Sequence, residues 1–197
     1  MASPRVKSLE LNLTQYAAYH RDRRNIATHF AGIPMIVLAL VIVGATITLP
    51  AGPLEITLAA VLAIAACIYY LVLDVAFGVA MAVALFAACA VASEAVARLG
   101  IPLSLAAALA LFVAGWALQF LGHHYEGLKP AFYDDVKQLL IGPLFLCAEV
   151  FFALGAKPAL ARHIEERVGP VVARRTPTGK IRFEERDPRA GQGADRA

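Results

Sequence analysis

Long runs without a charged side chain constrain this chain more than any other feature. Four stretches contain no Asp, Glu, Lys or Arg and a fifth contains only Glu149: 30–54, 56–73, 75–93, 99–122 and 138–156. A bilayer core of about 30 Å takes roughly 20 helical residues at about 1.5 Å each. The chain is 59% hydrophobic and 17% charged, whereas soluble domains are about half apolar and a quarter charged. Each run is therefore close to one membrane crossing.

The pattern predicts an all-α fold, a polytopic transmembrane helix bundle with four to five membrane-embedded helices. Turn-forming residues and Asp74 separate the expected helices, which cover about 25–49, 55–73, 75–97 and 103–122. The fifth run is interrupted by Gly142-Pro143. We interpret it as a re-entrant or interfacial segment, because a full crossing would place the basic tail outside the membrane. Residues 1–157 are expected to form the membrane-embedded domain, and 158–197 a basic cytoplasmic tail, largely disordered at its end.

The distribution of Lys and Arg predicts the orientation. The first 24 residues contain five of these side chains, and the 50–54 turn contains none. This bias places the N-terminus and the 123–137 connector together on the cytoplasmic face. We therefore expect an integral membrane protein, in the inner membrane of a bacterium or the endoplasmic reticulum of a eukaryote. The sequence has no basic, aromatic-laced module, so no nucleic-acid partner is expected.

Four of the five histidines lie in the two segments that share this face: His20, His29, His123 and His124. Imidazoles near carboxylates suit a redox-active divalent iron or a zinc ion. On a straight helix, the nine-residue spacing puts His20 and His29 on opposite sides. Either the helix breaks between them, with Asp22 capping a new helix near Arg23, or the two histidines serve different ions.

The second polar segment follows helical spacing. Gln119, His123 and Glu126 line one face if the helix continues through Gly122. His124 is turned by about 100° from His123, which makes it the less favoured ligand. Glu126 either ligates a metal, orients a histidine through its second ring nitrogen, or forms a weak surface ion pair.

Asn25 lies four residues before His29 and shares its helix face. It is expected to hold His29 or a ligand oxygen, or to form a hydrogen bond at the helix end.

The two segments resemble the small membrane family of Mpo-type 2-hydroxy fatty acid dioxygenases. The first family pattern, a histidine followed by Asn and a second His before Gly-Ile-Pro, is matched by His20, Asn25, His29, Gly32, Ile33 and Pro34. The second pattern is matched by Gln119, Phe120, Gly122, His123, Glu126, Gly127, Pro130 and Ala131. The resemblance covers about 16–157.

This resemblance implies an enzyme that needs Fe2+ and converts a long-chain 2-hydroxy fatty acid and O2 to a fatty acid one carbon shorter, the α-oxidation reaction. It implies iron ligands His20, His29 and His123, with His124 at a variable position. Beside the resemblance, we predict catalytic roles for Glu126 and Asn25 and contacts of Arg21, Arg24 and Gln119 with the substrate head group. For the arginines, membrane anchoring is an equally good interpretation. The acyl chain would lie between the helices and come from membrane lipid, and 1–157 would be the iron-binding domain.

Other functions remain open at this point. A non-catalytic membrane protein that binds a lipid or metabolite would have the same composition. A transporter would more naturally place polar groups at mid-membrane, whereas here they gather at one edge. Di-iron hydroxylases and desaturases use more histidine ligands than the five histidines that this chain contains.

Overall fold

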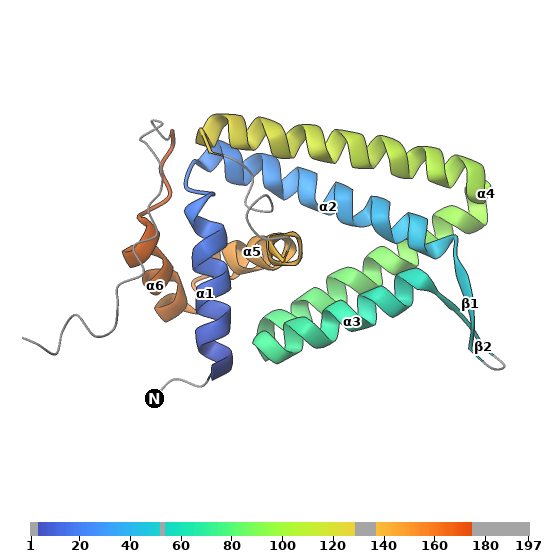
Figure 1. Ribbon diagram of the computed structural model, residues 1–197, viewed down its shortest axis with the longest axis horizontal. Helices are drawn as coiled ribbons and strands as arrows, with labels where there is room; N and C mark the ends of the chain where they lie inside the picture. The colour runs from blue at the N-terminus through green and yellow to red at the C-terminus, as the bar shows by residue number, and fades with distance from the viewer. Residues whose placement is uncertain (1–3, 52–53, 129–136, 175–197) are drawn as a thin grey trace, which may run out of the picture.

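The structure, a computed structural model, describes residues 4–51, 54–128 and 137–174. Within these residues the chain forms helices joined by short connections and one β-hairpin (Figure 1). The elements in order are α1 (Pro4–Ala18), α2 (Arg23–Ala45), β1 (Thr48–Ala51), β2 (Leu54–Thr57), α3 (Leu58–Leu73), α4 (Val75–Glu126), α5 (Gln138–Ala153) and α6 (Pro158–Val168). The predicted all-α class is confirmed.

The chain breaks between α1 and α2, at the place where the histidine spacing required a break. Asp22 is the N-cap of α2: its backbone is extended, and its side chain accepts a hydrogen bond from the Arg24 backbone N–H at 2.8 Å. Such a cap satisfies one of the donors that a helix start leaves unpaired. The four residues from 19 to 22 therefore form a loop outside both helices, and α1 and α2 leave this loop in different directions (Figure 1).

A second break divides α4 into two arms. Gly100 has φ 73° and ψ 164°, which is not a helical conformation, and Pro102 follows it. The break predicted at 98–102 is thus confirmed. Figure 1 shows the arm before Gly100 beside α3 and the arm after it beside α2.

Small residues let α2 and the second arm of α4 approach closely. A Cβ on Gly115 would lie 2.7 Å from Ile36 Cγ1 and 2.9 Å from the Gly32 carbonyl oxygen. Any side chain at this position would push the helices apart. Close contact through small residues is a common way for helices to pack where lipid replaces water.

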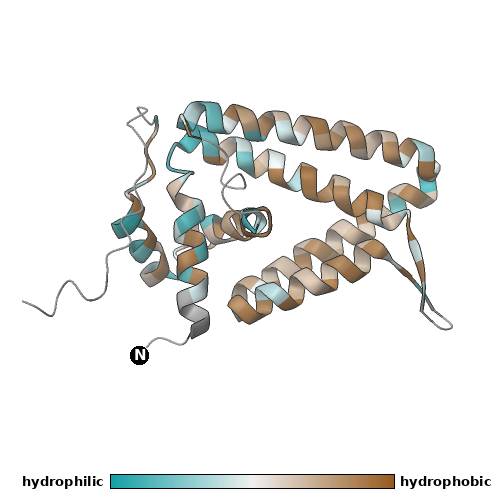
Figure 2. Cartoon of the chain, in the orientation of Figure 1, coloured by the Kyte–Doolittle hydropathy of each residue, from teal (hydrophilic) through white to brown (hydrophobic). Residues whose placement is uncertain are grey.

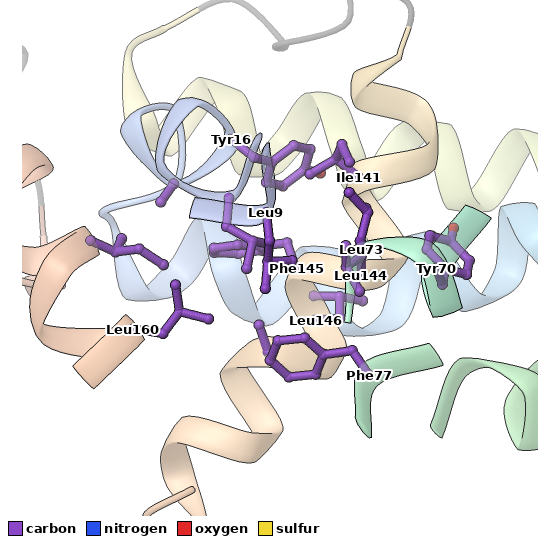
Figure 3. Packing of buried hydrophobic residues seen from close by; sticks show 14 of the residues in the cluster. Leu9, Tyr16, Tyr70, Leu73, Phe77, Ile141, Leu144, Phe145, Leu146 and Leu160 are labelled. Atoms are coloured by element: carbon purple, nitrogen blue, oxygen red, sulfur yellow. The ribbon is translucent and has the colours of Figure 1, made fainter. Parts of the chain in front are cut away.

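A hydrophobic cluster joins α1 to α5 and to the ends of α3, α4 and α6 (Figure 3). Leu13 and Tyr16 of α1 are buried against Ile141, Leu144 and Phe145 of α5 and their neighbours. Residues 4–18 are therefore helical, and one face of α1 belongs to the core.

Two details differ from the prediction. Residues 48–51 and 54–57 form an antiparallel hairpin, with Leu49 opposite Ile56, so the first helix ends at 45 and the next begins at 58. The β-branched residues on both sides of the turn favour strands over helix ends. In the fifth run, α5 continues through Gly142 and Pro143. The chain instead turns by 114° between α5 and α6, where Gly155 and Lys157 have positive φ.

Two described helices are long and apolar enough to cross a membrane: α2 and α4. The bent pair α5 and α6 would make a third, and α3 is apolar but shorter. In Figure 2, α2 and α4 are largely hydrophobic along their lengths, and polar residues gather at the ends nearest α1 and again at the bend of α4. The predicted disorder beyond Thr176 falls outside the described residues.

Candidate metal centre

Three imidazoles meet where the loop before α2, α2 itself and the end of α4 come together. His20, His29 and His123 are all buried. Their ring centroids are 4.5 Å apart for His20–His29 and 5.0 Å for each pair that includes His123. One ring nitrogen from each histidine can be chosen so that all three lie within 4.8 Å of one another. A single ion could contact all three.

Hydrogen bonds fix which ring nitrogen of two histidines carries the proton. Nδ1 of His20 lies 2.7 Å from the Tyr16 carbonyl oxygen, and Nδ1 of His29 lies 2.9 Å from that of Asn25. A carbonyl oxygen only accepts, so each Nδ1 is the donor and each neutral ring has its lone pair on Nε2. These two Nε2 atoms face one another at 3.0 Å. Two lone pairs at this distance repel unless a cation lies between them.

The ring of His20 is held by aromatic neighbours. It stacks on Tyr16 with a centroid distance of 4.1 Å and an interplanar angle of 1°, and Phe145 lies 5.5 Å away. Burial, and next the neighbouring His29 and His123, lower the pKa of His20 well below its usual value. The imidazole is therefore neutral and able to act as a ligand.

Glu126 holds the loop that carries His20. Its fully buried carboxylate accepts hydrogen bonds from the backbone N–H groups of Arg21, at 3.0 and 3.1 Å, and Asp22, at 2.8 Å. The side-chain amide of Asn25 donates to it at 3.0 Å. Glu126 thus acts on the backbone of the loop, while the second ring nitrogens of His20 and His29 bond main-chain carbonyl oxygens.

Asn25 supports the same arrangement from α2. Its side chain spans from the Tyr19 carbonyl oxygen to Glu126, while its own carbonyl oxygen, not its side chain, accepts from His29. Gly122 makes room for this contact, because a Cβ there would lie 2.4 Å from Asn25 Oδ1 and 3.0 Å from His29 Nδ1.

A cavity of about 330 Å³ extends from the histidines between α2, α4 and α5. Its lining is mostly apolar and includes Tyr16, His29, Ile33, Ile36, Val37, Leu40, Phe112, Trp116, Gln119, His123, Gln138, Leu139, Gly142 and Pro143. Leu40 and Leu139 are 57% and 50% exposed, so the cavity reaches the apolar outer surface. This shape suits an elongated apolar ligand whose head contacts the histidines.

The two predicted head-group arginines have other partners and do not line the cavity. The Arg21 side chain donates to the carbonyl oxygens of Ala17, His20 and Gly169, and lies 3.9 Å from Glu149. Arg24 pairs with the carboxylate of Asp22 and lies over the ring of Tyr125. Of the predicted head-group residues, Gln119 is the one that the structure places in the cavity. His124 is exposed and stands apart from the three clustered histidines.

Comparison with known proteins gives the family of the chain. Residues 6–154 match the family described as 2-hydroxy-palmitic acid dioxygenase Mpo1-like. The chain belongs to the Mpo1-like family. It is 29% identical over 159 residues to the 2-hydroxy-palmitic acid dioxygenase MPO1 of Saccharomyces cerevisiae, which covers 80% of this chain and 87% of the yeast protein. No solved structure matches it.

Two parts of the site in this Mpo1-like protein were not predicted. Gln138 at the start of α5 lines the cavity, and its only signal in the sequence is a polar residue at the edge of an apolar run. The segment after α6 covers the histidine loop: the Val172 N–H donates to the Arg21 carbonyl oxygen, and the Arg23 N–H to that of Val172. No sequence pattern predicts this pairing.

Replacing Glu126 with Gln should loosen the loop without changing the shape of the side chain. The amide nitrogen would face backbone donors that now bond a carboxylate, and charge-assisted hydrogen bonds contribute about 1.5–3 kcal/mol each. We expect amide hydrogen exchange at Arg21 and Asp22 to accelerate by about tenfold or more, the effect of losing one such hydrogen bond. Glu94→Gln is the matched control, since Glu94 is an exposed residue of the same helix paired with Arg98. Unchanged exchange at both amides would contradict this role.

Proposed function

We propose that this protein is an Fe(II)-dependent dioxygenase that shortens long-chain 2-hydroxy fatty acids by one carbon. The observation that carries the proposal is the pair of facing Nε2 atoms of His20 and His29, with His123 beside them. Two nitrogens that each lie about 2.1 Å from one ion, at about a right angle, are about 3.0 Å apart. This is the observed separation.

The residues present fit such an ion. Three neutral imidazoles suit iron or zinc, and the family name, a dioxygenase, favours the redox-active metal. The iron would supply binding positions for substrate oxygens and O2 and a route for electrons between them. His20, His29 and His123 would hold it, and Glu126 and Asn25 would position His20 and His29 through the loop and the first turn of α2.

The cavity accounts for the substrate class. Its apolar walls accept an acyl chain, and its position beside His29 and His123 brings the carboxylate end of that chain to the metal centre. One 2-hydroxy acid and one O2 give the shorter acid, one carbon dioxide and one water. All electrons that O2 accepts come from carbons 1 and 2, so no further reductant is needed.

The protein would take this substrate from the bilayer. The described helices α2 and α4 are long and apolar enough to span it, and the cavity reaches their outer surface. We further propose that four to five helical segments are membrane-embedded. The histidines then lie near the cytoplasmic edge, with the first part of the chain and the end of α4 on the same side, and 158–197 follows as a cytoplasmic tail.

The metal assignment predicts the behaviour of histidine variants. His20→Ala, His29→Ala and His123→Ala should each lower the Fe(II) content of protein purified without oxygen, and the His29/His123 double variant should retain almost none. Asn25→Ala and Glu126→Gln should lower affinity less, by about 10–100-fold, as expected for residues that position a ligand. His124→Ala is the control, because this exposed side chain is the immediate neighbour of His123. Full iron content in the double variant would rule out this centre.

The reaction is tested with purified protein, Fe(II), O2 and 2-hydroxypalmitate, without a 2-oxoacid or nicotinamide. The expected product is the fifteen-carbon acid, measured by mass spectrometry together with carbon dioxide. Absence of that product, or equal consumption of palmitate, would disprove the reaction and favour a lipid-binding protein.

The topology predicts labelling of single cysteines introduced after Cys67, Cys89 and Cys147 are replaced. Exposed positions Arg23 and His124 should react with an impermeant thiol reagent from the cytoplasmic side. Glu55 in the hairpin should react from the opposite side, since Figure 1 places β1 and β2 at the far end of α2. Labelling of Arg23 and His124 from opposite sides would contradict the shared site.

A further inference from the structure

Two amide side chains interrupt the otherwise apolar wall of the cavity near the histidines. Gln119 on α4 and Gln138 on α5 both line it, and they are 6% and 5% exposed. Nε2 of Gln119 and Oε1 of Gln138 are buried and have no hydrogen-bond partner in the part of the chain that the structure describes. Such groups are costly to bury without a partner, so their place in a ligand cavity indicates that a ligand supplies one.

The packing around Gln119 is adapted to keep it there. A Cβ on Gly32 of α2 would lie 2.4 Å from Gln119 Nε2, so only glycine at this position leaves space for the amide. Gln119 lies one turn before His123 on the same face of α4, and both line the cavity. The donor is therefore next to the metal centre.

The two unpaired atoms need different hydrogen-bond partners. Gln119 Nε2 is a donor and needs an acceptor, which a carboxylate or a hydroxyl oxygen provides. Gln138 Oε1 is an acceptor and needs a donor. An ionised fatty acid has no donor in its head group, whereas a 2-hydroxy acid has one in its hydroxyl group.

We propose that Gln119 and Gln138 together recognise the head of the substrate: Gln119 donates to its carboxylate, and Gln138 accepts from its 2-hydroxyl. This inference rests on the proposed function for the identity of the ligand. It adds that the protein distinguishes 2-hydroxy acids from ordinary fatty acids before any metal takes part. A plain fatty acid leaves Gln138 unsatisfied, and sites built to bond a hydroxyl discriminate strongly against ligands that lack it.

The experiment measures binding to metal-free protein in nanodiscs, by displacement of a fluorescent fatty acid. The competitors are 2-hydroxypalmitate, palmitate and 2-fluoropalmitate, the last carrying a substituent of similar size that cannot donate. Wild-type protein should bind 2-hydroxypalmitate about tenfold or more tightly than either competitor, the order expected for one buried hydrogen bond. Equal binding of the three acids overturns the inference, and this comparison needs no variant.

Variants then assign the two contacts. Gln138→Met should bring the ratio of 2-hydroxypalmitate to palmitate affinity close to one, and Gln119→Met should weaken both acids while largely keeping that ratio. Gln15→Met on α1 is the matched control, because Gln15 does not line the cavity. A ratio that Gln138→Met leaves unchanged also overturns the inference.

The same data separate this inference from the proposed reaction. If metal-free protein prefers 2-hydroxypalmitate but Fe(II) and O2 yield no shortened acid, the reaction is wrong and the recognition stands. If the shortened acid forms while metal-free protein shows no preference, the recognition by Gln119 and Gln138 is wrong and the reaction stands.

Discussion

The buried carboxylate of Glu126 is the interaction on which the rest of the site depends. It joins the end of α4 to a loop 105 residues earlier in the chain by accepting the N–H groups of Arg21 and Asp22. A carboxylate without partners would be very costly at a position with no exposed surface, so these donors and the loop conformation stabilise one another. Because the loop is fixed in this way, His20 turns toward His29 and His123. The clustering of the three histidines is a consequence of how the loop is held.

The segment after α6 also holds the histidine loop, by hydrogen bonds on the side away from Glu126. The carbonyl oxygen of Arg21 and the N–H of Arg23 pair with Val172 after α6, and the Arg21 guanidinium bonds the Gly169 carbonyl oxygen. Arg21, predicted to contact the substrate head group, instead ties α1, the loop and the C-terminal segment together. Its guanidinium also lies 3.9 Å from Glu149, the acidic residue of the fifth apolar run.

Much of this could be read from the sequence because it follows from helical periodicity. The nine-residue spacing of His20 and His29 required a break if they were to meet, and Asp22 was a good cap for the helix that follows it. The spacing of Gln119, His123 and Glu126 placed all three on one face, as observed. The features that could not be predicted are hydrogen bonds to backbone groups and contacts between segments that are far apart in the sequence. No periodicity shows that Glu126 bonds backbone N–H groups, or that the chain bends after α5. The hairpin at 48–57 was not predicted, because its apolar residues were assigned to the ends of the two neighbouring helices.

The apolar length of the cavity and its polar end would contribute differently to the free energy of binding. From His29 to Leu40 it follows α2 for eleven residue steps, 40 minus 29, or about 16.5 Å at about 1.5 Å per residue. An extended chain advances about 1.2 Å per bond, so this length takes about fourteen bonds of an acyl chain. Moving that chain from water would be favourable by up to about 0.8 kcal/mol per methylene, but moving it from lipid gains little. In the proposed reaction, the acyl chain would therefore be selected by its fit to the cavity and delivered along the helices. If the proposed substrate binds here, selection by free energy would come from the polar end, where Gln119 and Gln138 line the cavity together with His29 and His123.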